Sequence, residues 1–319
     1  MAITAGAYGT SNGVTTTTAA NFIPEIWSDE IVAAYKKSLV MANLVRKMSH
    51  KGKKGDTIHI PMPSRAAAQA KAANTLVKIQ QDTESVVDIS INKHYEISRL
   101  IEDIVSVQAL SSLRKFYTDD AGYGLARQTD TDLIQLGRSM NNGAGTNVYA
   151  TAYAGGDGAT AYVAGSNNES ALTDVGLRRL IQRLDDNDIP MDRRHLVVPP
   201  STRNTLMGIA RFTEQGFTGE AGSGNTIRNG KIGDLYGIDV YVTPQCDTAS
   251  GSNAARIGLI FHEDSLALVE QMGVRTQTQY KQEYLADLMT ADALYGVGLI
   301  RKGDDADVPA GGFAIALPA

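Results

Sequence analysis

Histidines, carboxylates and the single cysteine are the residues of this sequence that can bind metals or act as catalysts. The five histidines include no pair spaced four residues apart on an expected helix, so the zinc motif of metalloproteases is absent. Cys246 follows Pro244 and Gln245 at the end of an expected strand without a basic neighbour, so we expect a structural thiol. A lone cysteine also excludes an intramolecular disulfide and a cysteine-based metal cluster.

Aspartates gather at the end of one expected helix, at Asp185, Asp186, Asp188 and Asp192. Their spacing differs from that of a calcium-binding loop. Negative charge is unfavourable near a helix C-terminus, so we expect Arg193 or Arg194 to pair with these carboxylates. A weak divalent-cation site is the alternative.

A glycine-rich run at 219–224 has the composition of a phosphate-binding loop but not its pattern. It lacks the Gly-Lys-Ser/Thr ending, follows no strand and carries Glu220 where an anion would sit. The Gly-x-Ser-x-Gly nucleophile motif is absent as well. A carboxylate pair of the glycosidase kind stays open, because the separation in space decides it. The residues therefore favour no class of enzyme.

The composition is that of a folded and mildly acidic chain, with 319 residues, 43% hydrophobic residues and a net charge of -5. This length allows two domains, or one core with extensions. No general cationic surplus attracts the chain to nucleic acid or to anionic membrane. The basic turn at 50–56 either faces solvent or meets phosphate or an acidic neighbour. No apolar run is long enough to span a bilayer, so we expect no membrane partner.

The elements that must position these residues are organised around one long amphipathic helix, expected over residues 119–140. Apolar or small side chains recur every three or four residues on one face, at Ala121, Leu125, Thr129, Leu133, Leu136 and Met140. The opposite face carries charges, at Asp120, Arg127, Asp130 and Arg138. We expect a cap at 118–120 and a left-handed stop at 141–143, which gives a length of roughly 33 Å.

Two segments of alternating polarity, at 57–62 and 85–97, predict an antiparallel hairpin on which His59 and His94 can face one another as a packing pair. The loop between them, 63–84, is unusually long for a compact domain. It is rich in Arg, Ala, Gln, Lys and Asn, and its apolar content is mostly alanine. Such a loop buries little on its own molecule. We therefore expect a projecting hairpin whose tip packs against another chain.

The rest of the chain divides into an N-terminal part and a second unit that starts at Thr173. We expect a flexible arm at 1–20, a helix at 25–48, a lead-in helix at 100–117 and a surface loop at 143–170. Trp27 on the first of these helices belongs either to the core or to a contact with a neighbouring subunit. In the second unit we expect helices at 173–187 and from Pro200, a mobile segment at 211–230, and strands at 195–198, 232–242, 257–261, 266–269, 274–280 and 291–300.

The order of these segments resembles the major capsid proteins of tailed bacteriophages with the Hong Kong 97-type fold, in particular those of podophages. The stretches that carry the resemblance are 22–28, 41–45, 55–61, 85–91, 101–103, 125–130, 195–200, 237–240 and 291–297. The resemblance implies an α+β fold. Its parts would be an N-terminal arm with the following helix at 1–50, an extended E-loop hairpin at 51–99, a P-domain with a long spine helix and a surface excursion at 100–172, a mixed α/β A-domain at 173–258, and strands at 259–319 that close the A- and P-domains.

The function that this resemblance implies is structural, with no catalysis and no cofactor. The subunit would assemble in the host cytoplasm into hexamers and pentamers of an icosahedral shell, the virion capsid, around double-stranded DNA held without sequence specificity. A portal protein would be a further partner. So would a separate scaffolding protein, because only residues 1–20 precede the fold. Some family members crosslink a lysine to an asparagine, but no local pattern supports that role for a lysine of the loop.

Side chains of the arm region and of the long loop are our candidates for contacts between subunits. They are Phe22, Trp27, Arg65, Gln69, Lys71, Lys78 and Gln80. Two other functions remain as alternatives. One is an encapsulin-like compartment shell with the same fold, and the other is an enzyme with an unrecognised carboxylate site.

Overall fold

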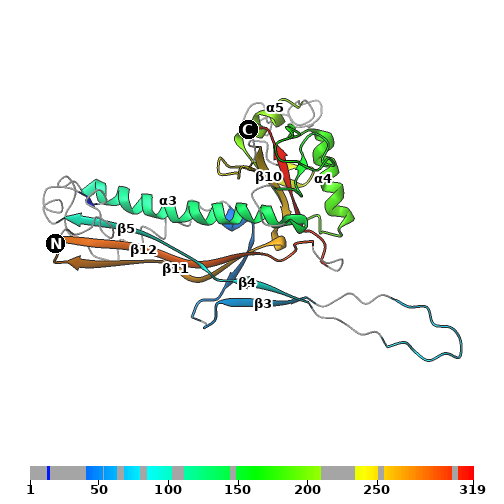
Figure 1. Cartoon of the computed structure of the whole chain (residues 1–319), viewed down its shortest axis with the longest axis horizontal. Coiled ribbons are helices and arrows are strands. Elements are labelled where there is room, and N and C mark those ends of the chain that lie inside the picture. The colour runs from blue at the N-terminus through cyan, green and yellow to red at the C-terminus, as the bar shows by residue number, and fades with distance from the viewer. Residues whose placement is uncertain are drawn as a thin grey trace, which may run out of the picture.

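A computed structural model of the chain describes residues 13–14, 41–52, 54–62, 68–79, 85–102, 111–143, 149–209, 234–250, 255–303 and 308–319. The molecule is elongated, with a long sheet and a long helix at one end, a more compact part at the other, and a projecting hairpin (Figure 1). Most of the expected arm and the residues at 25–40 and 211–230 lie outside the described residues.

The long helix is α3 (Ser111–Gln135), which continues into the 3-10 turn η3 (Leu136–Asn142) and lies along the long sheet (Figure 1). Its expected stripe is confirmed, because Ala121, Leu125 and Leu133 are buried. The expected stop is confirmed too, since Asn141 and Asn142 adopt left-handed backbone angles, with φ of 51° and 59°.

The start of this helix was predicted wrongly. The helix begins at Ser111, so the expected cap at 118–120 lies inside it. Of the expected lead-in helix at 100–117, residues 100–102 belong to strand β5 (Lys93–Glu102), residues 111–117 belong to α3, and residues 103–110 lie outside the described residues. Aspartates inside a helix imitate the composition of a cap, which misplaced the boundary. Asp130, which we expected on the exposed face, is buried. A hydrogen bond from the backbone N–H of Met41, at 3.2 Å, compensates its buried carboxylate.

The long sheet has five strands in the order β1-β5-β12-β11-β2. Its antiparallel centre consists of β5 (Lys93–Glu102), β12 (Ala286–Leu299) and β11 (Leu266–Lys281), and the short strands β1 (Gly13–Val14) and β2 (Arg46–Ser49) join its edges in parallel. The two strands expected at 266–269 and 274–280 are one strand, interrupted by bulges between 270 and 275. The expected helix at 25–48 is wrong at its end, where β2 pairs with β11.

The second unit contains a six-stranded sheet in the order β6-β13-β10-β7-β9-β8. Its strands are β6 (Tyr153–Ala154), β13 (Gly312–Leu317), β10 (Arg256–His262), β7 (Arg194–Val198), β9 (Ile238–Val242) and β8 (Asp234–Leu235). The helices α4 (Asp174–Asp186) and α5 (Pro200–Met207) begin where the sequence predicts, and the side chain of Thr173 caps α4 by accepting from the Gly176 N–H at 3.1 Å. Buried leucines of α4 pack with residues of β7, β10 and β13 in one core cluster.

The segment expected as a surface loop at 143–170 packs more closely than predicted. In its described part, Tyr149, Ala152 and Tyr162 are buried, and β6 pairs in parallel with β13. A charge-poor segment can enter a core because few of its side chains must stay solvated. These residues belong to a core cluster that also contains Leu133 of α3 and Leu259 of β10, so the two sheets share one hydrophobic core.

Candidate functional site

The projecting hairpin forms a two-stranded sheet of its own (Figure 1). Strand β3 (Thr57–Met62) pairs antiparallel with β4 (Ser85–Ser90), from Thr57 opposite Ser90 to Met62 opposite Ser85. The predicted hairpin is therefore confirmed over these residues. Pro61 is tolerated in β3 because a two-stranded ribbon leaves one side of each strand unpaired.

The base of the hairpin is fixed to the body of the subunit by apolar contacts. Ile89 and Ile91 are buried in a cluster with Ala267 and Val269 of β11 and with Ile300. Partly buried side chains of β3 pack against the same cluster. The hairpin is therefore a rigidly mounted extension of the long sheet, and its direction is set where β11 begins.

The return strand was predicted too long. It ends at Ser90, and β5 begins at Lys93 and crosses to the long sheet, where Tyr95 and Ile97 pack beneath α3. One alternating pattern thus covers two strands of different sheets, because alternation does not reveal the partner strand.

The expected pair of His59 and His94 does not form, because the two residues lie on different sheets. His59 Nδ1 lies 2.5 Å from Asp88 Oδ1, and His94 Nε2 lies 3.1 Å from Asp292 Oδ2. Each histidine is therefore satisfied by a carboxylate on its own sheet.

The tip of the hairpin, which we define as residues 68–79, continues beyond the paired strands and is exposed throughout. Three large aliphatic side chains of the tip are exposed to solvent. Leu76 is 94% exposed, Val77 is 77% exposed and Ile79 is 97% exposed. These three side chains were not predicted, because the apolar content of the loop is mostly alanine, although Leu-Val-x-Ile is an aliphatic cluster in the sequence.

The structure places some of the candidate contact residues on this tip. Gln69, Lys71 and Lys78 are exposed there beside the three aliphatic side chains. The other candidates lie outside the described residues, namely Phe22, Trp27, Arg65 and Gln80. The tip thus combines apolar side chains with two flanking cations.

The long helix is bonded to the long sheet by a buried polar network centred on Asp132. Its carboxylate accepts hydrogen bonds from Tyr295 at 2.8 Å, from Gln128 at 3.1 Å and from Tyr95 at 3.4 Å, and Lys93 Nζ lies 3.7 Å away. Burial raises the pKa of Tyr295, so this hydroxyl stays a donor. The network fixes the position of α3 on the sheet, because Tyr295 joins the helix to β12, and Tyr95 and Lys93 join it to β5.

The residues that suggested chemistry have structural roles in the described chain. Asp185 pairs with Arg194 at 2.7 Å and Asp192 with Arg193 at 3.4 Å, as expected. Within the described ranges no group of three metal-binding side chains comes together. Cys246 is buried, and burial raises its pKa to about 12, which confirms a structural thiol. The glycine-rich run at 219–224 lies outside the described residues.

Comparison with known proteins agrees with this picture of a structural subunit. The family model of phage capsid proteins matches residues 101–305. A structure of Mycobacterium phage Che8 has 21% identity and a TM-score of 0.63, and the match covers 87% of this chain and 90% of that one. The capsid structure of the cyanophage P-SCSP1u has 16% identity and a TM-score of 0.62, with 88% of each chain covered.

A third similar structure is a virus-like particle from Pyrococcus furiosus, with 11% identity, a TM-score of 0.51, and 91% of this chain and 98% of that one covered. At these identities the structural matches show a shared fold and nothing more. No curated protein sequence matches the chain. None of the helices in the described residues is long and apolar enough to cross a membrane.

The fold and the family match together define a shell-forming class of protein, and the chain belongs to the phage capsid protein family. It is a major capsid protein of a tailed phage, as expected, and part of the virion capsid. Its role is structural and not enzymatic, so the carboxylate-enzyme alternative is dropped.

Proposed function

We propose that this chain is the subunit of an icosahedral shell with the Hong Kong 97-type fold, in which copies assemble as hexamers and pentamers around double-stranded DNA. In this proposal the hairpin β3–β4 with its tip is the E-loop and α3 is the spine helix. The observation that carries the proposal is the tip, where three aliphatic side chains are almost fully exposed on an extension that stands away from the body (Figure 1).

Physical chemistry requires a partner for such a tip. Burying a Leu, Val or Ile side chain stabilises a protein by roughly 1.5–3 kcal/mol. Three such side chains exposed side by side therefore leave several kcal/mol of stabilisation available for binding to a partner. The tip projects away from its own core, so another molecule must cover it. A second copy is the partner always present at equal concentration. Contacts of one copy's tip with a different surface of the next are heterologous, and they close into rings when the rotation permits.

The remaining assignments follow from the same assembly. The parts of the subunit would be the arm at 1–50, the E-loop at 51–99, the P-domain at 100–172, the A-domain at 173–258 and the closing strands at 259–319. Phe22, Trp27, Arg65 and Gln80 would join Gln69, Lys71 and Lys78 at the contacts between subunits. A separate scaffolding protein and a portal protein would be partners during assembly in the host cytoplasm.

The net charge of -5 fits a shell that does not hold its genome tightly. Binding to DNA phosphates comes from clustered Lys and Arg, and a mildly acidic subunit provides little of it overall. DNA would therefore be enclosed without sequence specificity. An encapsulin-like shell remains a second candidate on fold alone, because the particle from Pyrococcus furiosus shares the fold. The family match with phage capsid proteins favours the first.

The test replaces the tip aliphatics together, as Leu76→Ser, Val77→Ser and Ile79→Ser. We expect a subunit that keeps its thermal midpoint and circular dichroism spectrum but forms no particles by negative-stain microscopy or sedimentation. The matched control changes Ala68, Ala70 and Ala72 of the same tip to serine and should still assemble. Normal particles from the first variant, or wild-type protein that stays at 34.1 kDa under all salt and concentration conditions, would refute the proposal.

A further inference from the structure

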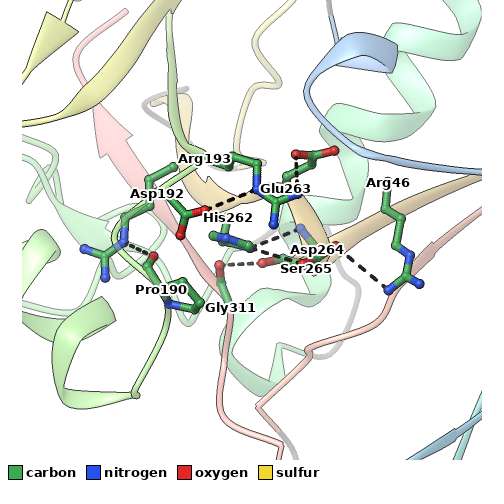
Figure 2. Close-up of polar contacts among 10 residues, drawn as sticks. Arg46, Pro190, Asp192, Arg193, His262, Glu263, Asp264, Ser265 and Gly311 are labelled. Carbon is green, nitrogen blue, oxygen red and sulfur yellow. Dashed lines mark hydrogen bonds and ion pairs between the residues drawn. The ribbon is translucent and has the colours of Figure 1, made fainter.

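The chain passes directly from the six-stranded sheet to the long sheet at one short corner. This corner is the 3-10 turn η4 (Glu263–Ser265), between β10 and β11 (Figures 1 and 2). Ser265 is buried there, its hydroxyl donates to the Gly311 carbonyl at 2.6 Å, and its own carbonyl accepts from the Ile300 N–H at 2.9 Å. The corner is thus tied to the return connection from β12 to β13.

His262 caps this corner with its side chain (Figure 2). Its Nδ1 accepts a hydrogen bond from the Asp264 N–H at 3.2 Å. An imidazole nitrogen that accepts carries no proton, so the proton of the neutral ring is on Nε2. The side chain is only 3% exposed, and Nε2 is buried without a hydrogen-bond partner among the described residues. The closed corner therefore requires a neutral ring in one tautomer.

Charged and titratable groups face this ring from several elements. Glu263 and Asp264 lie on η4 itself. Asp192 and Arg193 precede β7, and His195 lies on β7. Arg46 of β2 pairs with Asp264 at 3.9 Å. The three carboxylates favour a charged His262 ring, and Arg193 opposes it. A charged His262 would in turn lower the pKa of His195. Burial is the largest effect and lowers the pKa of His262 below its ordinary value.

The neighbouring His195 strengthens the same bias. Its ring lies between those of Tyr241 and Phe261, at centroid distances of 5.8 and 6.0 Å, and its buried Nδ1 has no hydrogen-bond partner in the described chain. Burial lowers the pKa of His195 as well. The carboxylate of Asp239, whose Oδ2 lies 3.9 Å from His195 Nδ1, opposes this effect but does not outweigh it, so burial favours the neutral form of both histidines.

We propose that His262 is an acid-sensitive cap that holds the corner between the two sheets closed when neutral and releases it when protonated. A proton on Nδ1 removes the acceptor for the Asp264 N–H and places a charge in a buried site. Asp264 Oδ2 lies 3.9 Å from Nδ1, beyond hydrogen-bond distance, and the other oxygen of this carboxylate lies 3.9 Å from Arg46, so Asp264 compensates the charged ring only in part. The inference concerns the single subunit and goes beyond its proposed role in a shell.

The direction of the pH dependence follows from proton linkage. In the closed corner the ring resists protonation, and in the open corner it regains its ordinary pKa of 6.5. The open state therefore binds more protons over the interval just below that value. The contribution of the cap is fully present above pH 6.5 and decreases as the pH falls to the lowered pKa of the closed state. One proton changes the opening equilibrium by up to about tenfold per pH unit in this interval.

Hydrogen–deuterium exchange of the full chain between pH 7.5 and 5, corrected for the intrinsic exchange rate, tests the inference. We expect protection of residues 262–266 to fall several-fold in the wild type as the pH decreases. Protection of α4, which contains no histidine, should stay constant. In His262→Asn the Asn oxygen can accept from the Asp264 N–H but does not titrate, so the corner should stay protected at every pH.

A second variant keeps the inference falsifiable if His262→Asn folds poorly. His262→Gln also offers an oxygen acceptor and should likewise remove the pH dependence. Three results would overturn the proposal. In the first, protection of residues 262–266 in the wild type does not depend on pH. In the second, His262→Asn or His262→Gln shows the same loss of protection at low pH as the wild type. In the third, this loss disappears in His195→Gln and persists in His262→Asn. Particle formation enters none of these measurements, so their outcome is independent of the proposed shell.

Discussion

Leu76 and Leu133 are the same side chain in opposite surroundings. Leu133 of α3 is fully buried between the helix and the long sheet, and Leu76 at the hairpin tip is 94% exposed. Within one molecule, the apolar side chains between the helix and the long sheet are buried, and the polar groups there are hydrogen-bonded through the Asp132 network. The tip contains apolar groups that nothing in the same molecule covers. The comparison shows that the first region contributes to the stability of the single subunit, while the second, under the proposed function, contributes to association between subunits.

The largest effect should come from removal of the tip region. Deletion of residues 66–81 should leave the free energy of unfolding nearly unchanged, because the described tip contributes no buried apolar side chain. Assembly should be abolished. Chemical denaturation and negative-stain microscopy measure the two quantities separately. If the deletion variant is unfolded, the tip contributes to the core of the subunit. If it forms normal particles, the tip makes no essential contact between subunits.

The opposite result is expected for the helix–sheet contact. Leu133→Ala should lower the free energy of unfolding by about 2–5 kcal/mol, the range for truncating a buried leucine. Tyr123→Ala on the exposed side of the same helix is the matched control and should change stability by less than about 1 kcal/mol. Urea denaturation of the unassembled subunit is the measurement. Equal losses in the two variants would mean that α3 does not pack as described.

A smaller loss should follow from changes to the polar network. Asp132→Ala leaves the Tyr295 hydroxyl buried without its acceptor and should cost about 1–3 kcal/mol. Asp132→Asn keeps an oxygen that accepts from Tyr295 and should cost less. Urea denaturation of the two variants separates the shape and acceptor of the side chain, which Asn keeps, from its negative charge, which both variants lose. If the Asn and Ala variants are equally destabilised, the charge of Asp132 beside Lys93, and not its packing or a neutral acceptor, stabilises the contact.

Local signals in the sequence predicted those parts of the fold that depend on neighbours in the chain. Strand β3, the cap of α4 at Thr173 and the start of α5 at Pro200 follow from alternation, a capping hydroxyl and a proline. The errors depend on partners far along the chain. Strand β2 interrupts an expected helix because β11, more than 200 residues later, offers an edge to residues 46–49.

The candidate site was predictable in its place but not in its details. An overlong loop between two alternating strands identified the projecting tip, because such a loop has no core of its own. Its aliphatic cluster was overlooked in an average over the loop. The acid-sensitive corner was not predictable, since nothing near His262 in the sequence distinguishes a capping histidine from any other. Only the turn after β10 brings its Nδ1 to the Asp264 N–H.

The smallest effect in this comparison should come from the cations of the tip. Lys71→Gln together with Lys78→Gln removes two exposed charges and leaves Leu76, Val77 and Ile79 in place. Exposed charges act mainly on the rate of association, and salt screens them over about 10 Å at 0.1 M ionic strength. We expect assembly a few-fold slower at low salt and unchanged at high salt, measured by light scattering. A loss of assembly that persists at high salt would mean that the lysines make buried contacts, and the aliphatic side chains would then no longer be the main source of association at the tip.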